Sequence, residues 1–248
     1  MLAFLDRFNI SLGSWFGIPV TLHWTWLMAF TLSFFGGTTF VGLFVGLFLI
    51  VLLHEFGHCF AAKMYGRDVA DIKLTILGGI ARLQLPENPR QEIVVALAGP
   101  AVNVALIPVL GALGLFVAHF FILLSLYNIV ILLFNLVPAF PMDGGRVLRA
   151  LLTMWFGNRT KATLWATRIG QGFCVLMAIC GLLIPNITLV FVAGFIAMSG
   201  QREYDMVKGN AQVAAADARA QGIAAAQRII ADAQRAHQQQ VNRQNNLS

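Results

Sequence analysis

Three long stretches without a charged side chain constrain this fold more than any other feature. Residues 8–53, 93–142 and 169–201 contain no Lys, Arg, Asp or Glu at all. A helix needs about 20 apolar residues to cross the hydrocarbon core of a bilayer, so each of the first two stretches has room for two crossings. Charged residues make up only 11% of the 248-residue chain, whereas about a quarter of a soluble domain is charged. The chain is therefore expected to be an integral membrane protein.

Breaks in the apolar pattern divide these stretches into individual helical spans. The breaks fall at Gly36-Gly37, near His119 and at Pro185-Asn186, where flexible or helix-breaking residues can end a helix. The expected spans lie near residues 20–36, 39–62, 93–117 and 120–138. Residues 169–201 form either two short spans or one tilted span, and the charges outside the apolar stretches decide between these possibilities.

The positive charges alternate with uncharged connections along the chain. All seventeen Lys and Arg fall in four segments, which are the N-terminus, residues 63–92, residues 143–168 and the chain after residue 201. Under the positive-inside rule the basic segments are cytoplasmic. This predicts six spans in the plasma or inner membrane, with both termini in the cytoplasm. The +6 net charge is dispersed between apolar blocks and does not form one basic face, which argues against nucleic-acid binding.

The predicted fold is an all-α membrane protein with six transmembrane helices and a short β-hairpin on the cytoplasmic side. Residues 69–85 carry the hairpin signal, because two β-branched apolar runs flank Gly78-Gly79, a pair suited to a two-residue turn. Residues 9–23 alternate and are rich in glycine, which predicts a short strand pair at the membrane surface. The six-span core is expected to cover residues 1–200. Residues 201–248 are rich in Ala, Gln and Arg and are expected to form a cytoplasmic helical tail.

The sequence His54-Glu55-Phe56-Gly57-His58 carries the strongest chemical signal. On a helix, residues four apart share a face, so the two imidazoles can bind one zinc ion. Glu55 then lies beside the open coordination position, where it can take a proton from a water molecule. The alternative is a pair of packed histidines with a surface glutamate. That alternative is poor, because ionisable groups at the end of a membrane helix are costly without a partner.

A zinc site of this kind needs a third protein ligand. Asp143 follows the predicted fourth span and lies on the same side of the membrane as His54 and His58. It belongs to the sequence N-L-V-P-A-F-P-M-D-G-G (135–145), in which two prolines break the helix and two glycines let the backbone turn closely around a bound group. Glu92 is the next candidate for the third ligand.

Together these motifs resemble the site-2 protease family of intramembrane zinc metalloproteases, which are peptidases of the M50 type. The resemblance extends to G-I-P-V-T-L-H-W (17–24), A-G-P-A-V-N (98–103) and R-V-L-R-A (146–150), which occur in the same order. It implies one zinc ion held by His54, His58 and Asp143, with Glu55 as the catalytic base. It also implies an endopeptidase of regulated intramembrane proteolysis that cuts a transmembrane segment near the cytoplasmic face.

Two asparagines are further candidates for the active site. Asn135 and Asn103 each lie on a span that can bring the amide near the metal, where it could donate a hydrogen bond to a developing oxyanion or hold the substrate backbone. Polar contacts between helices are the alternative interpretation for both. The rival function is a non-catalytic metal-binding scaffold or transporter that reuses the fold. The expected partners are a transmembrane protein or peptide substrate and the lipid bilayer, with a homo-oligomer left open.

Overall fold

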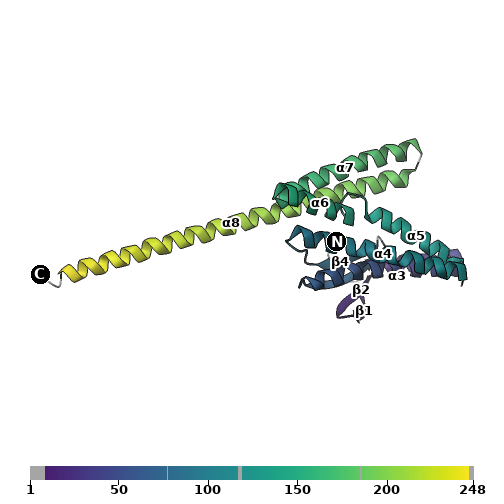
Figure 1. Ribbon diagram of the computed structural model, residues 1–248, viewed down its shortest axis with the longest axis horizontal. Helices are drawn as coiled ribbons and strands as arrows, with labels where there is room; N and C mark the ends of the chain where they lie inside the picture. The colour runs from purple at the N-terminus through teal and green to yellow at the C-terminus, as the bar shows by residue number, and fades with distance from the viewer. Residues whose placement is uncertain (1–8, 77, 117–118, 185, 246–248) are drawn as a thin grey trace. The chain divides into compact units, whose positions relative to one another are not determined.

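The computed structural model describes the backbone of residues 9–76, 78–116, 119–184 and 186–245, with side chains up to residue 230 (Figure 1). The chain forms two compact units, Met1–Glu203 and Tyr204–Ser248. The strands are β1 (Asn9–Trp15), β2 (Ile18–His23), β3 (Val69–Thr75) and β4 (Gly78–Leu83). The helices are α2 (Trp24–Ser33), η1 (Phe34–Gly36), α3 (Gly37–Met64), α4 (Pro89–Phe116), α5 (Phe120–Asn135), α6 (Asp143–Phe156), α7 (Arg159–Leu183) and α8 (Ile187–Asn245).

Three helical stretches among the described residues are long and apolar enough to cross a membrane. They are Trp24–Met64, which joins α2, η1 and α3, together with α4 and α7. The helix α5 is apolar but has only 16 residues, and α8 becomes polar after Gly200. Over the described residues the protein is therefore mostly helical with three candidate membrane spans, and the six crossings expected from the sequence are not confirmed. The first expected span also began too early, because residues 20–23 belong to β2.

The outer surfaces of these helices are covered by large apolar side chains. Leu115 and Phe116 at the end of α4 are 77% and 86% exposed, and Leu176 and Leu182 of α7 are 59% and 70% exposed. Soluble monomers rarely expose apolar surface on this scale. Hydrocarbon tolerates it, because the backbone polar groups are satisfied within each helix. This surface fits a protein surrounded by lipid.

Both predicted strand pairs are present, and they join into one four-stranded sheet. The strand order is β1-β2-β3-β4, with antiparallel pairs at both ends and a parallel pair β2-β3 in the middle. The sequence did not indicate the parallel pair. One face of the sheet is apolar and packs against α3. Val20 and Ile72 of the sheet belong to the same buried cluster as Leu52 and Phe56 of α3. This cluster fixes the sheet against the helix that carries the H-E-x-x-H sequence.

The second hairpin does not turn at Gly78-Gly79, as the sequence indicated. Thr75 pairs with Gly78, so both glycines belong to β4. A glycine is needed at position 79 because of its contact with α3 and not because of a turn. A Cβ atom there would meet Glu55 Cγ at 2.6 Å. The glycine therefore permits a close approach of β4 to α3, which is why a pair that favours tight turns is found within a strand.

The helix α4 lies at the centre of the first unit and packs against α3, α5 and α6. Figure 1 shows α3, α4 and α5 running side by side. The helices α3 and α4 approach each other closely at Gly57, where a Cβ atom would meet the carbonyl oxygen of Ala98 at 2.6 Å. The two backbones therefore touch within the H-E-x-x-H sequence, and the functional face of α3 points into the bundle.

Candidate metal centre

The helix α3 and the start of α6 bring three possible metal ligands together. His54 and His58 lie one turn apart on α3, and Asp143 is the first residue of α6. All three side chains are buried. The Nε2 atoms of the two histidines are 3.1 Å apart, and each is 3.2 Å from Asp143 Oδ2. The three atoms form a nearly equilateral triangle, so their lone pairs can converge on one ion.

The opposite nitrogen of each imidazole is held by an oxygen atom. His58 Nδ1 lies 2.7 Å from the carbonyl oxygen of Val95, and His54 Nδ1 lies 2.5 Å from Oδ1 of Asn103. A carbonyl oxygen only accepts hydrogen bonds, so both Nδ1 atoms carry the proton and both Nε2 atoms are free to coordinate. Metal-binding histidines are commonly oriented in this way.

The triangle of acceptor atoms fits zinc. Asp143 Oδ2 is buried without a hydrogen-bond partner among the described residues, although it faces both Nε2 atoms. Three acceptors at this separation repel one another unless a cation lies among them. A tetrahedral zinc ion with bonds of about 2.0–2.1 Å holds neighbouring donor atoms about 3.3 Å apart, close to the separations found here.

The charge of Asp143 is also that of a ligand. Burial alone would raise the pKa of this carboxyl group, but hydrogen bonds from protonated imidazoles of His54 and His58 and the charge of Arg146 hold the pKa below its usual range, and a cation bound in place of the imidazole protons would act in the same direction. The group is therefore a carboxylate. Gly144 and Gly145, which follow it, are required by the loop before α6, because a Cβ atom at Gly145 would meet the backbone of Ala139 at 2.6 Å. The glycines turn the chain tightly enough to aim Asp143 at α3.

Gly99 of α4 is a residue of the site that sequence reasoning did not single out. A Cβ atom there would collide with Nε2 of His58 and would lie 2.7 Å from Nε2 of His54. The backbone of α4 therefore passes directly beside the two coordinating nitrogens. The sequence signal for Gly99 was its position within A-G-P-A-V-N, because a glycine inside a helix often marks a place where another part of the structure comes close to the helix backbone.

Glu55 joins the metal-binding helix to the sheet. It is partly buried, and its Oε2 accepts a hydrogen bond of 3.1 Å from the backbone N–H of Ala81 in β4. Since β4 is the last strand of the sheet, this N–H belongs to its outer edge. The carboxylate next to His54 in sequence is thus held beside the outer edge of β4.

The two asparagines predicted from the sequence occupy different places. Asn103 is fully buried and contacts His54, as described above. Its amide nitrogen donates a hydrogen bond of 2.7 Å to Oδ1 of Asn128, whose own amide donates to the backbone oxygen of Asn103 at 2.8 Å. Asn135 is the last residue of α5 and is partly buried. Asn128 was missed, although a lone amide in the middle of an apolar span is a sequence signal for a polar contact between helices.

Glu92, the alternative third ligand, is engaged elsewhere. It is fully buried and accepts hydrogen bonds of 2.9 and 2.5 Å from Arg149 and of 2.9 Å from Arg159. Arg149 also pairs with Glu203, and its guanidinium lies 5.1 Å from the ring centre of Phe140. This group links four helices to the loop before Asp143. Glu92 therefore serves a buried ion-pair network and is not part of the metal-binding group.

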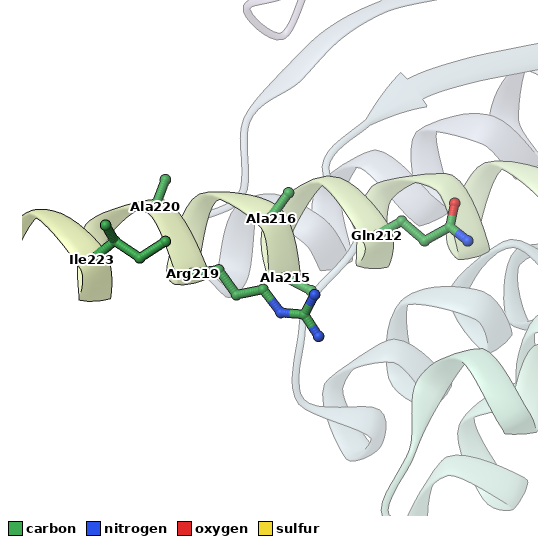
Figure 2. Close-up of a pocket in the computed structure, with 6 residues that line it drawn as sticks. All are labelled: Gln212, Ala215, Ala216, Arg219, Ala220 and Ile223. Carbon is green, nitrogen blue, oxygen red and sulfur yellow. The ribbon is translucent and has the colours of Figure 1, made fainter.

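The tail helix carries a shallow surface groove but no comparable cluster among its described side chains. Figure 2 shows its lining, which comes entirely from α8: Gln212, Ala215, Ala216, Arg219, Ala220 and Ile223. All six side chains are exposed. A groove formed along a single helix by alanines offers a ligand little enclosure, and it is not a candidate site.

The fold and the site define an apolar helical protein with a buried metal centre of two histidines and one carboxylate. Comparison with known families agrees, since the model of peptidase family M50 matches residues 42–120 and 110–179. This match covers more than half of the chain, and the chain belongs to peptidase family M50.

Individual relatives support the assignment. A zinc metalloprotease of Methanocaldococcus jannaschii is 36% identical over 218 residues, which are 82% of this chain and 62% of that protein. A protein of Synechocystis named a putative zinc metalloprotease is 38% identical over 188 residues, 66% of this chain and 50% of that protein. Stage IV sporulation protein FB of Bacillus subtilis is 31% identical over 166 residues, 64% of this chain and 57% of that protein. The chain thus spans about half to three-fifths of the length of these curated relatives.

A solved structure is similar as well. The site-2 protease from Methanocaldococcus jannaschii superposes with a TM-score of 0.62 at 35% sequence identity, covering 79% of this chain and 95% of that one. The names of these relatives and the geometry of His54, His58 and Asp143 together identify zinc as the metal of this centre.

Proposed function

We propose that this protein is a zinc-dependent endopeptidase that cuts a transmembrane segment of a membrane-protein substrate near the cytoplasmic face. The observation that carries the proposal is the triangle of His54 Nε2, His58 Nε2 and Asp143 Oδ2, with Glu55 next in sequence to the first ligand. A transport or scaffold site would also bind a metal, but it would have no use for a glutamate that lies between the two metal-binding histidines in the sequence. Membership of peptidase family M50 favours the catalytic alternative.

The residues divide the chemistry between them. Zinc held by His54, His58 and Asp143 would supply a Lewis acid that polarises the scissile carbonyl and lowers the pKa of a water molecule. Glu55 takes the proton from the attacking water and later returns it to the leaving amine. Asn135, at the end of α5, is the candidate donor to the carbonyl oxygen as negative charge develops there.

The edge of β4 is the proposed docking position for the scissile segment. A protease holds its substrate extended, yet a membrane-spanning substrate arrives as a helix whose backbone groups are satisfied internally. Unwinding it in hydrocarbon leaves donors and acceptors unpaired at a cost of several kcal/mol each. An exposed strand edge can pair with an incoming extended segment through main-chain hydrogen bonds. The contact between Ala81 and Glu55 supports this position, because it joins the β4 edge to the proposed base.

We place the protein in the plasma or inner membrane, with six crossings and both termini in the cytoplasm. The three long apolar stretches account for part of this topology, and α5 and the apolar start of α8 would supply further crossings. The segregation of Lys and Arg into alternate connections sets the orientation. The metal centre then lies at the cytoplasmic end of α3, within reach of water from that side.

The proposal is tested with the purified full chain in detergent. It should cleave members of a panel of single-span membrane peptides, lose that activity when a chelator removes the metal, and regain it when zinc is restored. Mass spectrometry of the products should place the cut within the apolar segment. Tight zinc binding without cleavage of any peptide would favour the metal-binding scaffold or transporter.

A further inference from the structure

Asn128 forms the outer end of a hydrogen-bonded relay that leads to a metal ligand. It lies in the middle of α5 and is fully buried. Its Oδ1 accepts from Nδ2 of Asn103, and its own Nδ2 donates to the backbone oxygen of Asn103. Oδ1 of Asn103 in turn faces Nδ1 of His54. One amide on α5 therefore holds another on α4, which holds a ligand on α3.

The direction of this relay decides which nitrogen of His54 can bind a metal. The side-chain amide of Asn103 has one accepting end and one donating end. With the oxygen toward His54, Nδ1 keeps its proton and Nε2 is free. If the amide turned over, its NH₂ group would face Nδ1, and the imidazole would have to accept there and carry its proton on Nε2. That tautomer cannot coordinate a metal through Nε2, which is the atom that faces Asp143.

Asn128 supplies the preference between the two orientations. Its Oδ1 faces Asn103 Nδ2 at 2.7 Å, and its Nδ2 is already committed to the backbone of Asn103 at 2.8 Å. Turning the Asn103 amide over would bring two oxygens together in a fully buried position, where an unsatisfied acceptor is costly. The Asn128 amide cannot turn in compensation, because its oxygen would then face the carbonyl of Asn103.

We propose that Asn128 is a positioning residue that locks the Asn103 amide and thereby holds His54 in the metal-binding tautomer. The inference rests on the metal centre described above and does not depend on peptide cleavage. The competing explanation is that the pair of amides only joins α4 to α5, as polar contacts between membrane helices often do. The two explanations make different predictions for a variant of Asn103 that has no NH₂ group to turn toward His54.

The experiment measures zinc affinity of the detergent-solubilised full chain by competition with a chromophoric chelator. Asn128→Leu removes the lock, and zinc affinity should fall about 10- to 100-fold, the range found when outer partners of metal ligands are lost. Asn128→Asp, protonated at this fully buried position, keeps an oxygen toward Asn103 Nδ2 and a hydroxyl group that can donate to the backbone oxygen of Asn103, and should retain most of the affinity. Ser125→Ala, at another buried position of α5, is the matched control and should bind zinc as the wild type does.

A second background separates locking from helix joining. Asn103→Asp offers His54 an oxygen in either orientation, so adding Asn128→Leu to it should change zinc affinity less than threefold. The visible spectrum of bound Co²⁺ should change in Asn128→Leu and be restored in Asn128→Asp. If Asn128→Leu does not accumulate in the membrane, Asn128→Ala makes the same comparison with a smaller side chain.

Three results would overturn the inference. The first is wild-type zinc affinity and an unchanged Co²⁺ spectrum in Asn128→Leu or Asn128→Ala. The second is an equal loss of affinity from Asn128→Leu in the wild-type and Asn103→Asp backgrounds, which is the outcome of helix joining alone. The third is absence of zinc binding by the wild type, which would remove the metal centre itself. If the wild type cleaves membrane peptides but substitutions of Asn128 do not change zinc affinity, the proposed function stands and this inference is refuted.

Discussion

Hydrogen bonding at Nδ1 leaves His54 and His58 able to coordinate a metal through the same ring nitrogen, Nε2. The carbonyl oxygen of Val95 and the amide oxygen of Asn103 each take the Nδ1 proton, so the two Nε2 atoms face Asp143 without a proton between them. The chemistry of the site is therefore set as much by α4 as by the H-E-x-x-H sequence on α3.

Removing any one ligand should empty the centre. We expect His54→Ala, His58→Ala and Asp143→Ala each to abolish stoichiometric zinc binding, because three protein ligands leave none to spare. Metal analysis of the purified variants checks this, with Glu92→Gln as the control because Glu92 lies in the ion-pair network. Full zinc content in Asp143→Ala, with zinc lost from Glu92→Gln, would mean that the third ligand is Glu92.

A single methyl group on α4 should have a similar effect. Gly99→Ala would place a Cβ atom against the Nε2 atoms of both histidines, and we expect zinc affinity to fall about tenfold or more. Gly111→Ala is the matched control, because it lies on the same helix with nothing within 4 Å of its Cβ position. Equal zinc affinities in the two variants would show that α4 does not closely flank the ligands.

The edge strand β4 is the element on which we propose that substrate presentation depends. Ala81 directs its N–H outward to Glu55, so the alternation of an antiparallel ladder directs the N–H of Ile80 toward β3. Ala81→Pro should therefore lower kcat/KM about 10- to 100-fold, the loss expected for a hydrogen bond to a charged group, while zinc content stays normal. Peptide-cleavage kinetics with parallel metal analysis provide the measurement.

The neighbouring position controls for damage to the sheet. Ile80→Pro removes a donor that points into the ladder and should lower the thermal unfolding temperature more than Ala81→Pro, since proline is tolerated best on a free edge. Wild-type kinetics in a folded Ala81→Pro protein would rule out a role for the Ala81 N–H in catalysis.

The individual elements differ in how far the sequence determines them. The two strand pairs and the ligand set follow from local patterns, namely apolar alternation and the spacing of His54 and His58. The parallel pairing of β2 with β3 does not, because α2 and α3 lie between these strands in sequence and only packing against α3 joins them. Gly79 was assigned to a turn for the same reason, since the demand for a glycine comes from Glu55 on another element.

Asn128 and Glu92 show the same limit within the site. A buried amide or carboxylate in an apolar chain signals a polar partner, but the sequence does not say which one. The partner of Asn128 lies on α4, and those of Glu92 lie on α6 and α7. Contacts between helices therefore had to come from the three-dimensional arrangement, whereas the ligands themselves could be predicted.

For the molecule as a whole, the proposed membrane topology rests on the distribution of positive charge. Reporter fusions at residues 85, 160 and 230 should read as cytoplasmic, and fusions at residues 37, 119 and 186 should read as extracytoplasmic, because every Lys and Arg lies either in the N-terminus or in the segments that contain residues 85, 160 and 230. A fusion at residue 230 that reads as extracytoplasmic would show that the number of crossings is odd, contrary to the proposed six.

The most direct test of the central claim is a paired measurement on Glu55→Gln. The substitution removes a base and leaves the three proposed ligands intact, so the variant should bind one zinc ion per chain with wild-type affinity while cleavage of a single-span substrate falls to background. Cleavage by Glu55→Gln at the wild-type rate, with zinc bound, would contradict the account.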